Sequence, residues 1–384
     1  MRLTRRGALL GLGCAMTLGR AALALARVPT ERRFVVVLLR GGMDGLSVLV
    51  PHGDRDLAAW RAPLVPAGLL DLGGFWGLHP ALPGLHDMYA AGEALAVQSV
   101  AGPDRSRSHF AAQDALELGN SGHGLADGWL NRVAGAIGAP ALAVGAGVPL
   151  LLRGRAPVDD FLPEGKWHAP ADYYAMVLAL NRSDRLTGPA MERALHDRGV
   201  TAAALAGAAP PSGQAAGFAT LASAAGRLLA APNGPRIAAL EADGWDTHVR
   251  QAPRLGRALA RLDAGLVALR QGLGDAWRQT AVLVVTEFGR TVRMNGSEGT
   301  DHGTATVAFV LGGAVAGGRV AGTWPGLAAG RLLDHRDLSP TTDVRAVAKG
   351  VLAQHLGLDE AALARVFPAS DTVGPMHGLL HGVT

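Results

Sequence analysis

The chain has 384 residues, of which 49% are hydrophobic, with 36 basic and 32 acidic side chains and one cysteine. Four of the arginines fall within residues 1–26, which hold no acidic residue, so 32 basic residues remain against 32 acidic ones in the rest of the chain. This balance gives no electrostatic basis for nucleic acid as a partner. Cys14 also lies in that segment, so residues 27–384 can form no disulfide. Their apolar content is ample for one large α/β domain.

Residues 1–26 predict an export signal. Arg5 and Arg6 precede a weakly hydrophobic Gly/Ala/Leu run that ends in Ala24-Leu25-Ala26, a sequence suited to cleavage after a small residue. Paired arginines in this context indicate the twin-arginine export machinery as a partner. A membrane-spanning helix needs about 18 uninterrupted apolar residues, and Arg20 interrupts this run. We therefore expect a periplasmic or secreted protein with no transmembrane anchor after cleavage.

The first predicted strand is the apolar run Phe34–Leu39, which is typical of a central parallel strand. A glycine-rich segment follows it and contains Asp44. In open α/β sheets, ligands bind at the carboxyl ends of the strands, so Asp44 is a candidate metal ligand. The alternative is that Asp44 caps a short helix that begins near Leu46.

The next predicted strand, Ala94–Val100, leads to a helix that ends near Leu118. Ser108 lies at the expected N-cap of this helix, beside Arg107. A helix N-terminus stabilises a bound anion, and a serine next to a metal is a candidate nucleophile. We therefore consider Ser108 as a catalytic nucleophile, with Arg107 holding anionic oxygens, and keep the plain N-cap as the alternative.

The region around 140–235 indicates a helical cover over the sheet edge, to which we assign no chemistry. A short strand-like run at 236–240 then leads to Asp246 and His248. In an extended chain these two side chains project to the same side and could bind one metal, although a turn aspartate and a solvated histidine give the same pattern. The leucines of residues 255–273 predict an amphipathic helix that returns the chain to the sheet in a βαβ unit.

Charged residues gather between two further predicted strands, Val282–Thr286 and Thr306–Leu311. Carboxylates with an imidazole form a credible metal-binding set, and a guanidinium there suits the anionic oxygens of a substrate. The alternative is a surface ion pair and a turn aspartate. Further on, residues 317–326 suggest a hairpin, and a helix is expected from Thr342 or Asp343 to about Gln354. The charged residues in question are Glu287, Arg290, Asp301 and His302.

Several motifs together resemble one bacterial family, the exported proteins grouped as domain-of-unknown-function family 1501. With the twin-arginine start, these motifs are LLRGGMDGLSVLVP, RSHFAAQD, GWDTH, TEFGR, TDHG, WPGL and LSPTTDVRAV, and they span nearly the whole chain after residue 26. The family looks like a branch of the alkaline phosphatase/sulfatase/phosphoglycerate mutase superfamily. The resemblance implies a parallel sheet between helices, two metal ions, and a nucleophile at a helix N-terminus.

The resemblance also implies roles for individual residues. Ser108 falls at the place of the superfamily's nucleophile, and Glu287-Phe288 takes the place of its Asp-His-Gly motif, which removes one ligand of a second metal. Asp246 and His248 correspond to an Asp-x-x-x-His pair, with a shorter spacing here. One implied metal site has Asp246, His248 and His302. The other has Asp44, Glu287 and either Ser108 or Asp301.

These observations predict an α/β protein of alkaline-phosphatase-like fold, with a mostly parallel central sheet sandwiched by helices in a single domain over residues 27–384. The expected function is an exported hydrolase of phosphate or sulfate esters. One or two divalent metals (Zn, Mn, Mg or Ca) would be its cofactor, and a small anionic ester or an envelope component its substrate. One alternative is a non-catalytic metal-binding or assembly protein of the cell envelope. Another is a metal-free serine hydrolase that uses Ser47 or Ser108 with His109.

Overall fold

The computed structural model describes residues 30–120, 124–145, 147–161, 176, 179, 181, 184 and 216–381. The predicted export signal and most of residues 162–215 lie outside these ranges. Within the described part of the chain, no helix is both long enough and apolar enough to cross a membrane.

In the described ranges, nine strands form one sheet in the order β11-β5-β10-β9-β1-β8-β6-β7, with β12 beside β5. All strand pairs in it are parallel except those of β10, which runs antiparallel to both β5 and β9. The short strands β2 (Leu49–Val50), β4 (Gly77–Leu78) and β3 (Leu70–Asp71) form a second sheet. The strands of the large sheet are β1 (Arg33–Arg40), β5 (Ala94–Ala101), β6 (Ala141–Val144), β7 (Val158–Phe161), β8 (Ile237–Asp243), β9 (Thr280–Thr286), β10 (Thr306–Leu311), β11 (Arg319–Ala321) and β12 (Thr342–Asp343).

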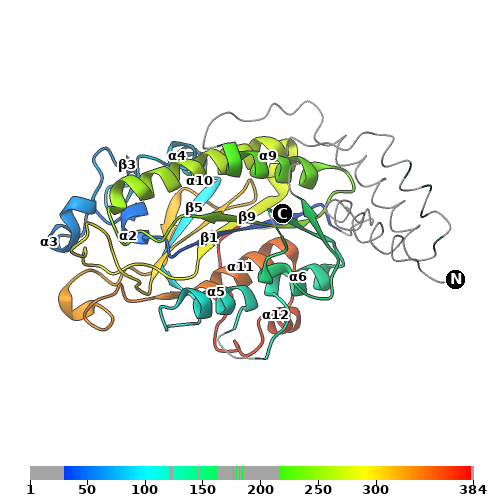
Figure 1. Ribbon diagram of the computed structural model, residues 1–384. Helices are drawn as coiled ribbons and strands as arrows, with labels where there is room; N and C mark the ends of the chain where they lie inside the picture. Colours follow the sequence, from blue (N-terminus) through cyan, green and yellow to red (C-terminus); the bar gives the residue numbers. More distant parts are fainter. Residues whose placement is uncertain are drawn as a thin grey trace.

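Helices cover both faces of the large sheet. Figure 1 shows α4 (Pro83–Ala90), α9 (Ala216–Ala230) and α10 (Gln251–Leu273) over one face. The other face carries α5 (His109–Leu118), α6 (Trp129–Ile137), α11 (Val344–Leu356) and α12 (Glu360–Val366). Shorter elements are α2 (Gly45–Val48), α3 (Leu57–Arg61) and the 3-10 turns Ala62–Leu64, Leu150–Leu152, Gly274–Gln279 and Ala329–Arg331.

The central strand β1 shows why the sequence folds in this way. Val35, Val37 and Leu39 are buried in the core under one helical layer, and Phe34 and Val36 are buried in the core under the other. Side chains alternate between the faces of a strand, so a strand between two helical layers must be apolar throughout. The α/β fold with a mostly parallel sheet sandwiched by helices is therefore confirmed.

Several predicted helices are confirmed as well. The leucine stripe of α10 is buried, from Leu255 to Leu273, and the helix connects β8 to β9, which lie on either side of β1. The α11 helix begins after Asp343, whose side chain accepts a hydrogen bond from the backbone N–H of Arg345. Both signals are local, which is why the sequence alone reveals them.

Two regions differ from the expectation. The start of the expected helical cover instead adds β6 and β7 to the sheet, because the buried run Ala141–Val144 pairs with β8. The α9 helix of the same region is helical as expected and packs against α10. The expected hairpin at residues 317–326 is instead β11, which pairs in parallel with β5. Short apolar runs do not distinguish strand from helix by periodicity, and pairing partners far along the chain decide the outcome.

The topology brings four loops to one edge of the sheet. Segments that leave β1, β5, β8 and β9 all start at the carboxyl ends of these strands, whose shared direction is fixed by the parallel pairings of β1 and by β10. Because β10 runs antiparallel to its neighbours, the loop that enters it lies at the same edge. The β9–β10 loop is thus one and the same, and every residue predicted as a metal ligand or catalytic residue belongs to one of these four loops.

Candidate metal centre

Four side chains from three of these loops converge on one point. Asp246 and His248 follow β8, His302 precedes β10, and His109 begins α5 after β5. The Oδ1 atom of Asp246 lies 3.6 Å from Nε2 of His109, 3.0 Å from Nε2 of His248 and 3.3 Å from Nε2 of His302. Donor atoms of His109, Asp246 and His302 all lie within 4.8 Å of one another, as in a metal site.

The hydrogen bonds on the far side of each imidazole fix its tautomer. In all three rings Nδ1 faces a carboxylate or carbonyl oxygen, which can only accept, so the ring donates its proton there. The neutral ring then keeps its lone pair on Nε2, the atom that faces Asp246. Metal-binding histidines in proteins are held by this same kind of partner. The three contacts are His109 Nδ1 to Glu287 Oε1 at 2.8 Å, His248 Nδ1 to Asp301 Oδ1 at 3.2 Å, and His302 Nδ1 to the Arg107 carbonyl oxygen at 2.9 Å.

This arrangement fits a bound cation. The Nε2 atoms of His248 and His302 are 2.9 Å apart, so two lone pairs face each other beside a carboxylate. The Nε2 atom of His109 is buried and has no hydrogen-bond partner. One shared proton would satisfy a single pair of these atoms, whereas one divalent cation can be held by His109, Asp246 and His302 together, with His248 beside them as a candidate fourth ligand. Three nitrogens and one carboxylate oxygen are ligands typical of zinc and related transition metals rather than of calcium or magnesium.

Electrostatics keep the ligands in the forms that bind a metal. Burial acts to raise the pKa of Asp246, but the hydrogen bond and charge of Arg290, together with His248, outweigh it and lower this pKa. Burial lowers the pKa of His302, which favours its neutral form. A metal ligand must be an ionised carboxylate or a neutral imidazole, so both shifts favour binding.

Glu287 lies behind His109 rather than at the point of convergence. Its side chain is 2% exposed. Besides the His109 proton, its Oε1 atom accepts hydrogen bonds from Gln113 Nε2 at 2.8 Å and from the Gly41 backbone N–H at 2.9 Å. Burial acts to raise the pKa of Glu287, but the hydrogen bond from Gln113 and its other donors outweigh this and lower it. Glu287 was predicted as a metal ligand, and in the structure its carboxylate contacts the Nδ1 side of the candidate ligand His109.

Asp301 was also predicted as a ligand, and it takes the corresponding position behind His248. Its Oδ1 atom accepts from His248 and from Asn295 Nδ2, the latter at 3.1 Å. The hydrogen bond from Asn295 and the contact with His248 lower the pKa of Asp301, so its carboxylate stays ionised. Asp301 therefore supports the cluster through His248.

Gly41 lets the end of β1 approach the cluster. Its φ angle is +126°, in a region that residues with a side chain rarely adopt, and a Cβ atom here would lie 2.7 Å from the backbone N of Asp246. Glycine is the residue that permits such a close approach.

Arg290 was predicted to hold a substrate's anionic oxygens, and the structure places it elsewhere. The side chain is 1% exposed. Its guanidinium donates to the backbone carbonyls of Gly41, Gly42 and Trp245, to the carbonyl of Thr300, and to the carboxylate of Asp246. Arg290 thus joins the loops after β1 and β8 and orients Asp246. A role in binding substrate finds no support in this arrangement.

Asp44, another of the predicted carboxylate ligands, lies in a separate buried ion pair. Both of its oxygens contact the guanidinium of Arg61, and the two side chains are each 1% exposed. Ser47 Oγ donates to the same carboxylate at 2.8 Å, and Gln251 Nε2 donates as well. These donors occupy Asp44, so metal binding by this residue finds no support here. The same contacts occupy the hydroxyl of Ser47.

Ser108 lies where the sequence placed it, at the N-cap of α5, between two residues of the centre. Its side chain makes no capping hydrogen bond and is partly exposed. The preceding residue, Arg107, has a φ angle of +61° and supplies the carbonyl that holds His302. The Arg107 guanidinium pairs with Asp334 at 2.6 Å and Asp337 at 2.8 Å, so these carboxylates occupy it.

His109 is the candidate ligand that the sequence did not reveal. It was considered only as a base for a serine hydrolase without metal. The available signal was its position at the start of the helix after β5, at the same edge as the other ligands. Phe288 packs against it, with ring centroids 4.8 Å from His109 and 4.9 Å from His302. Phe288 thus gives the site an apolar wall, and the described residues contain one group suited to a metal.

The structure thus combines a mostly parallel α/β sheet with a cluster of three imidazoles and one carboxylate at the carboxyl ends of its strands. The chain belongs to the family described as protein of unknown function DUF1501, whose model matches residues 93–367, more than half of its length. The predicted membership is thereby confirmed. A comparison with curated protein sequences finds no relative.

Solved structures similar to the chain include members of the alkaline phosphatase superfamily. A phosphonate monoester hydrolase of Agrobacterium radiobacter is 13% identical, with 85% of this chain and 74% of that chain covered and a TM-score of 0.42. An alkaline phosphatase superfamily protein from Vibrio parahaemolyticus is 10% identical, with 79% and 69% covered and a TM-score of 0.36. A variant of TAB5 alkaline phosphatase with bound magnesium is 11% identical, with 73% and 91% covered and a TM-score of 0.36.

Proposed function

We propose that the chain is an exported hydrolase of phosphate or sulfate esters that uses one divalent metal held by His109, Asp246, His248 and His302. The observation that supports it most is the convergence of three Nε2 lone pairs on one carboxylate oxygen, with each ring held from behind. When bound, the metal would lower the pKa of an attacking hydroxyl and neutralise charge on the transferred group.

Ser108 is the nucleophile in this proposal. It immediately precedes the ligand His109, and its hydroxyl is not used as a helix cap. The N-terminus of α5 favours the negative charge of a phosphate or sulfate group next to this serine. Phe288 limits water on one side of the ligands. Export through the twin-arginine machinery to the periplasm or the medium completes the proposal, on the basis of residues 1–26.

An ester screen tests the function. Protein purified without chelator is assayed on 4-nitrophenyl phosphate, 4-nitrophenyl phenylphosphonate and 4-nitrophenyl sulfate, with zinc, manganese, magnesium or calcium added. We expect metal-dependent turnover that falls about a thousandfold or more in Ser108→Ala and in His302→Ala, and is unchanged in the control His377→Ala, an exposed residue near the C-terminus. Turnover that survives a chelator and both substitutions would contradict the proposal.

One observation favours a second function, a non-catalytic metal-binding or assembly protein of the envelope. In the described part of the chain, the two candidate arginines Arg107 and Arg290, and Arg61 beside Asp44, all pair with carboxylates of the protein. None of the three is free to hold an ester. A protein that binds one metal per chain and turns over no ester in the screen would support this second function.

A further inference from the structure

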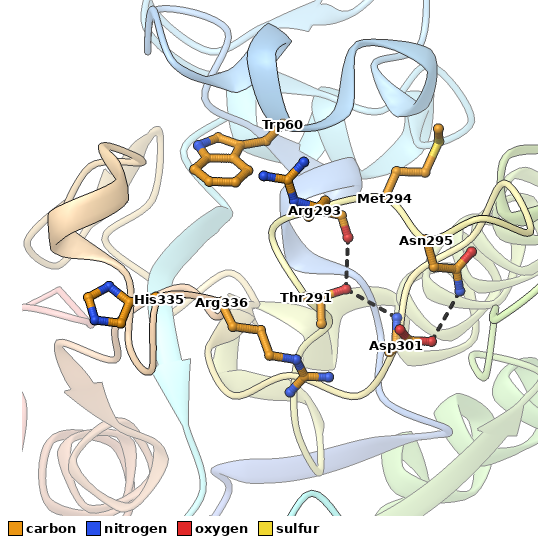
Figure 2. Close-up of a pocket in the computed structure, with 8 residues that line it drawn as sticks. All are labelled: Trp60, Thr291, Arg293, Met294, Asn295, Asp301, His335 and Arg336. Atoms are coloured by element: carbon orange, nitrogen blue, oxygen red, sulfur yellow. Dashed lines mark hydrogen bonds between the residues drawn. The ribbon is translucent and has the colours of Figure 1, made fainter.

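A pocket of about 200 Å³ lies next to the cluster of His109, Asp246, His248 and His302. Figure 2 shows Trp60 and Arg293 on one side of it, and Arg336, Asn295 and Asp301 on the other. They come from α3, from the loop between β9 and β10, and from the loop before β12. All of these residues belong to the described part of the chain.

Asp301 and Asn295 connect the pocket to the cluster. Asp301 lines the pocket, and its Oδ1 atom accepts the Nδ1 proton of the ligand His248. Asn295 also lines the pocket and donates through Nδ2 to Asp301 and to the His248 carbonyl oxygen, at 3.1 and 3.0 Å. A molecule that reacts at the cluster can therefore extend into the pocket with its part that is not transferred.

Two cations of the pocket have unsatisfied charge. The guanidinium of Arg293 lies 4.6 Å from the ring centroid of Trp60, and within the described ranges no carboxylate pairs with this exposed side chain. Arg336 contacts Asp337 at 3.4 Å, but the same carboxylate also pairs with Arg107 at 2.8 Å. Asp337 thus serves two guanidinium groups, and Asp301, which also lines the pocket, interacts with Arg336 as well. The pocket lining has two arginines and one carboxylate, so its net charge is positive.

Trp60 holds Arg293 in place. Its indole Nε1 donates to the Leu327 carbonyl oxygen at 2.8 Å, and its own carbonyl accepts from the Met294 backbone N–H at 3.4 Å. A cation over an aromatic face is stabilised in that position. Because the guanidinium already lies over the ring, a substrate ring would have to displace it to stack there. An anion, in contrast, can bind to the guanidinium where it is.

We propose that this pocket binds an anionic substituent, a carboxylate, sulfate or phosphate, on the part of the substrate that is not transferred. The inference rests on the proposed function and specifies its substrate as an ester with a second negative charge. Pockets for drug-sized ligands measure about 300 to 1,000 Å³, so a pocket of about 200 Å³ suits one small group. Arginine is the side chain that best recognises such oxyanions.

The test compares two ligands that cannot be hydrolysed, phenylphosphonate and 3-carboxyphenylphosphonate, by calorimetric titration of the full protein with its metal. A charge-assisted contact contributes about tenfold in affinity, so the wild type should bind the carboxylated ligand about tenfold more tightly. This preference should fall below about threefold in Arg293→Gln and be partly kept in Arg293→Lys. The control Arg278→Gln, at the opposite end of β9 and with a side chain 82% exposed, should keep it in full.

The outcomes separate the pocket from the proposed function. The pocket assignment is overturned if the wild type binds both ligands equally or binds neither, or if the preference survives Arg293→Gln. His302→Ala supplies the second comparison, because it removes a ligand of the cluster without touching the pocket. If the carboxylated ligand depends on Arg293 but binds His302→Ala as tightly as the wild type, the pocket stands and the metal-dependent ester site is wrong.

Discussion

Glu287→Gln is the substitution that best separates a residue that orients a ligand from a ligand itself. The structure places the Glu287 carboxylate behind His109, whose Nδ1 proton it accepts at 2.8 Å. Glutamine keeps the shape of the side chain and removes its negative charge. Its Oε1 atom can retain the donors His109, Gln113 and Gly41. Its new amide can donate to Thr286 Oγ1, whose own proton can go to the Leu39 carbonyl oxygen at 2.7 Å.

The expected magnitude follows from this geometry. Because every hydrogen bond has a replacement, the stability of the metal-free protein should stay within about 1 kcal/mol of the wild type. The loss is confined to the charge that makes His109 a stronger ligand. Substitutions of such supporting residues reduce metal affinity by about 10- to 100-fold, which corresponds to about 1.4 to 2.7 kcal/mol.

The assay is a zinc titration of metal-free protein against a competing chelator, at fixed pH because the ligands bind protons. Glu360→Gln, an exposed residue in the first turn of α12, is the matched control and should bind zinc like the wild type. Unchanged affinity in Glu287→Gln would refute the role through His109. A loss well above a thousandfold would show that Glu287 binds the metal directly, as the sequence predicted.

Three further predictions concern the frame around the site. Burial lowers the pKa of His355 to about 4 from 6.5. Between these pH values His355 is therefore protonated in the unfolded chain and neutral in the folded chain. The free energy of unfolding should therefore fall as the pH drops from 6.5, by about 3 kcal/mol once the pH is below 4. Measured by denaturant unfolding, it should depend less on pH in His355→Gln than in the wild type. The same pH dependence in both proteins would contradict this. Gly41→Ala should reduce the free energy of unfolding by about 2 kcal/mol or more and weaken metal binding, because its Cβ would lie 2.7 Å from Asp246 N. The control Gly92→Ala has a φ of +75° and open space around the new Cβ. In thermal unfolding it should lose only about 1 kcal/mol. Arg61→Met leaves the buried Asp44 carboxylate without its cation and should reduce the free energy of unfolding by about 3 to 5 kcal/mol. Adding Asp44→Asn should recover part of this loss, whereas loss of metal in Asp44→Asn alone would identify Asp44 as a ligand.

The sequence was sufficient for the main strands and for the edge of the sheet at which chemistry occurs. The runs at Phe34–Leu39 and Thr306–Leu311 are apolar throughout and rich in valine, which favours strands covered on both faces, and strand direction then brings their loops together. The sequence did not predict that β6 and β11 are strands of the large sheet. Their short runs become strands only because β8 and β5 offer unpaired edges, and such partners are distant along the chain.

Sequence position predicted which edge of the sheet holds the site, but not which side chains point to its centre and which lie behind the others. Glu287, Asp301 and His302 all belong to the same edge, yet only His302 directs a donor atom to Asp246, while the two carboxylates bind imidazole N–H groups. Which residue is the ligand depends on the direction of each side chain relative to the others. His109 was overlooked for the same reason, because nothing next to it in the sequence marks it as part of a cluster formed by distant loops. The export signal lies outside the described residues and stays a prediction.

The central claim is that His109, Asp246, His248 and His302 hold one metal, and elemental analysis of the protein purified without chelator tests it most directly. We expect about one zinc or other transition metal per chain in the wild type and in His377→Ala, and less than about a tenth of that in His302→Ala and in His109→Ala. Full metal content in His109→Ala, or no metal in the wild type, would contradict it.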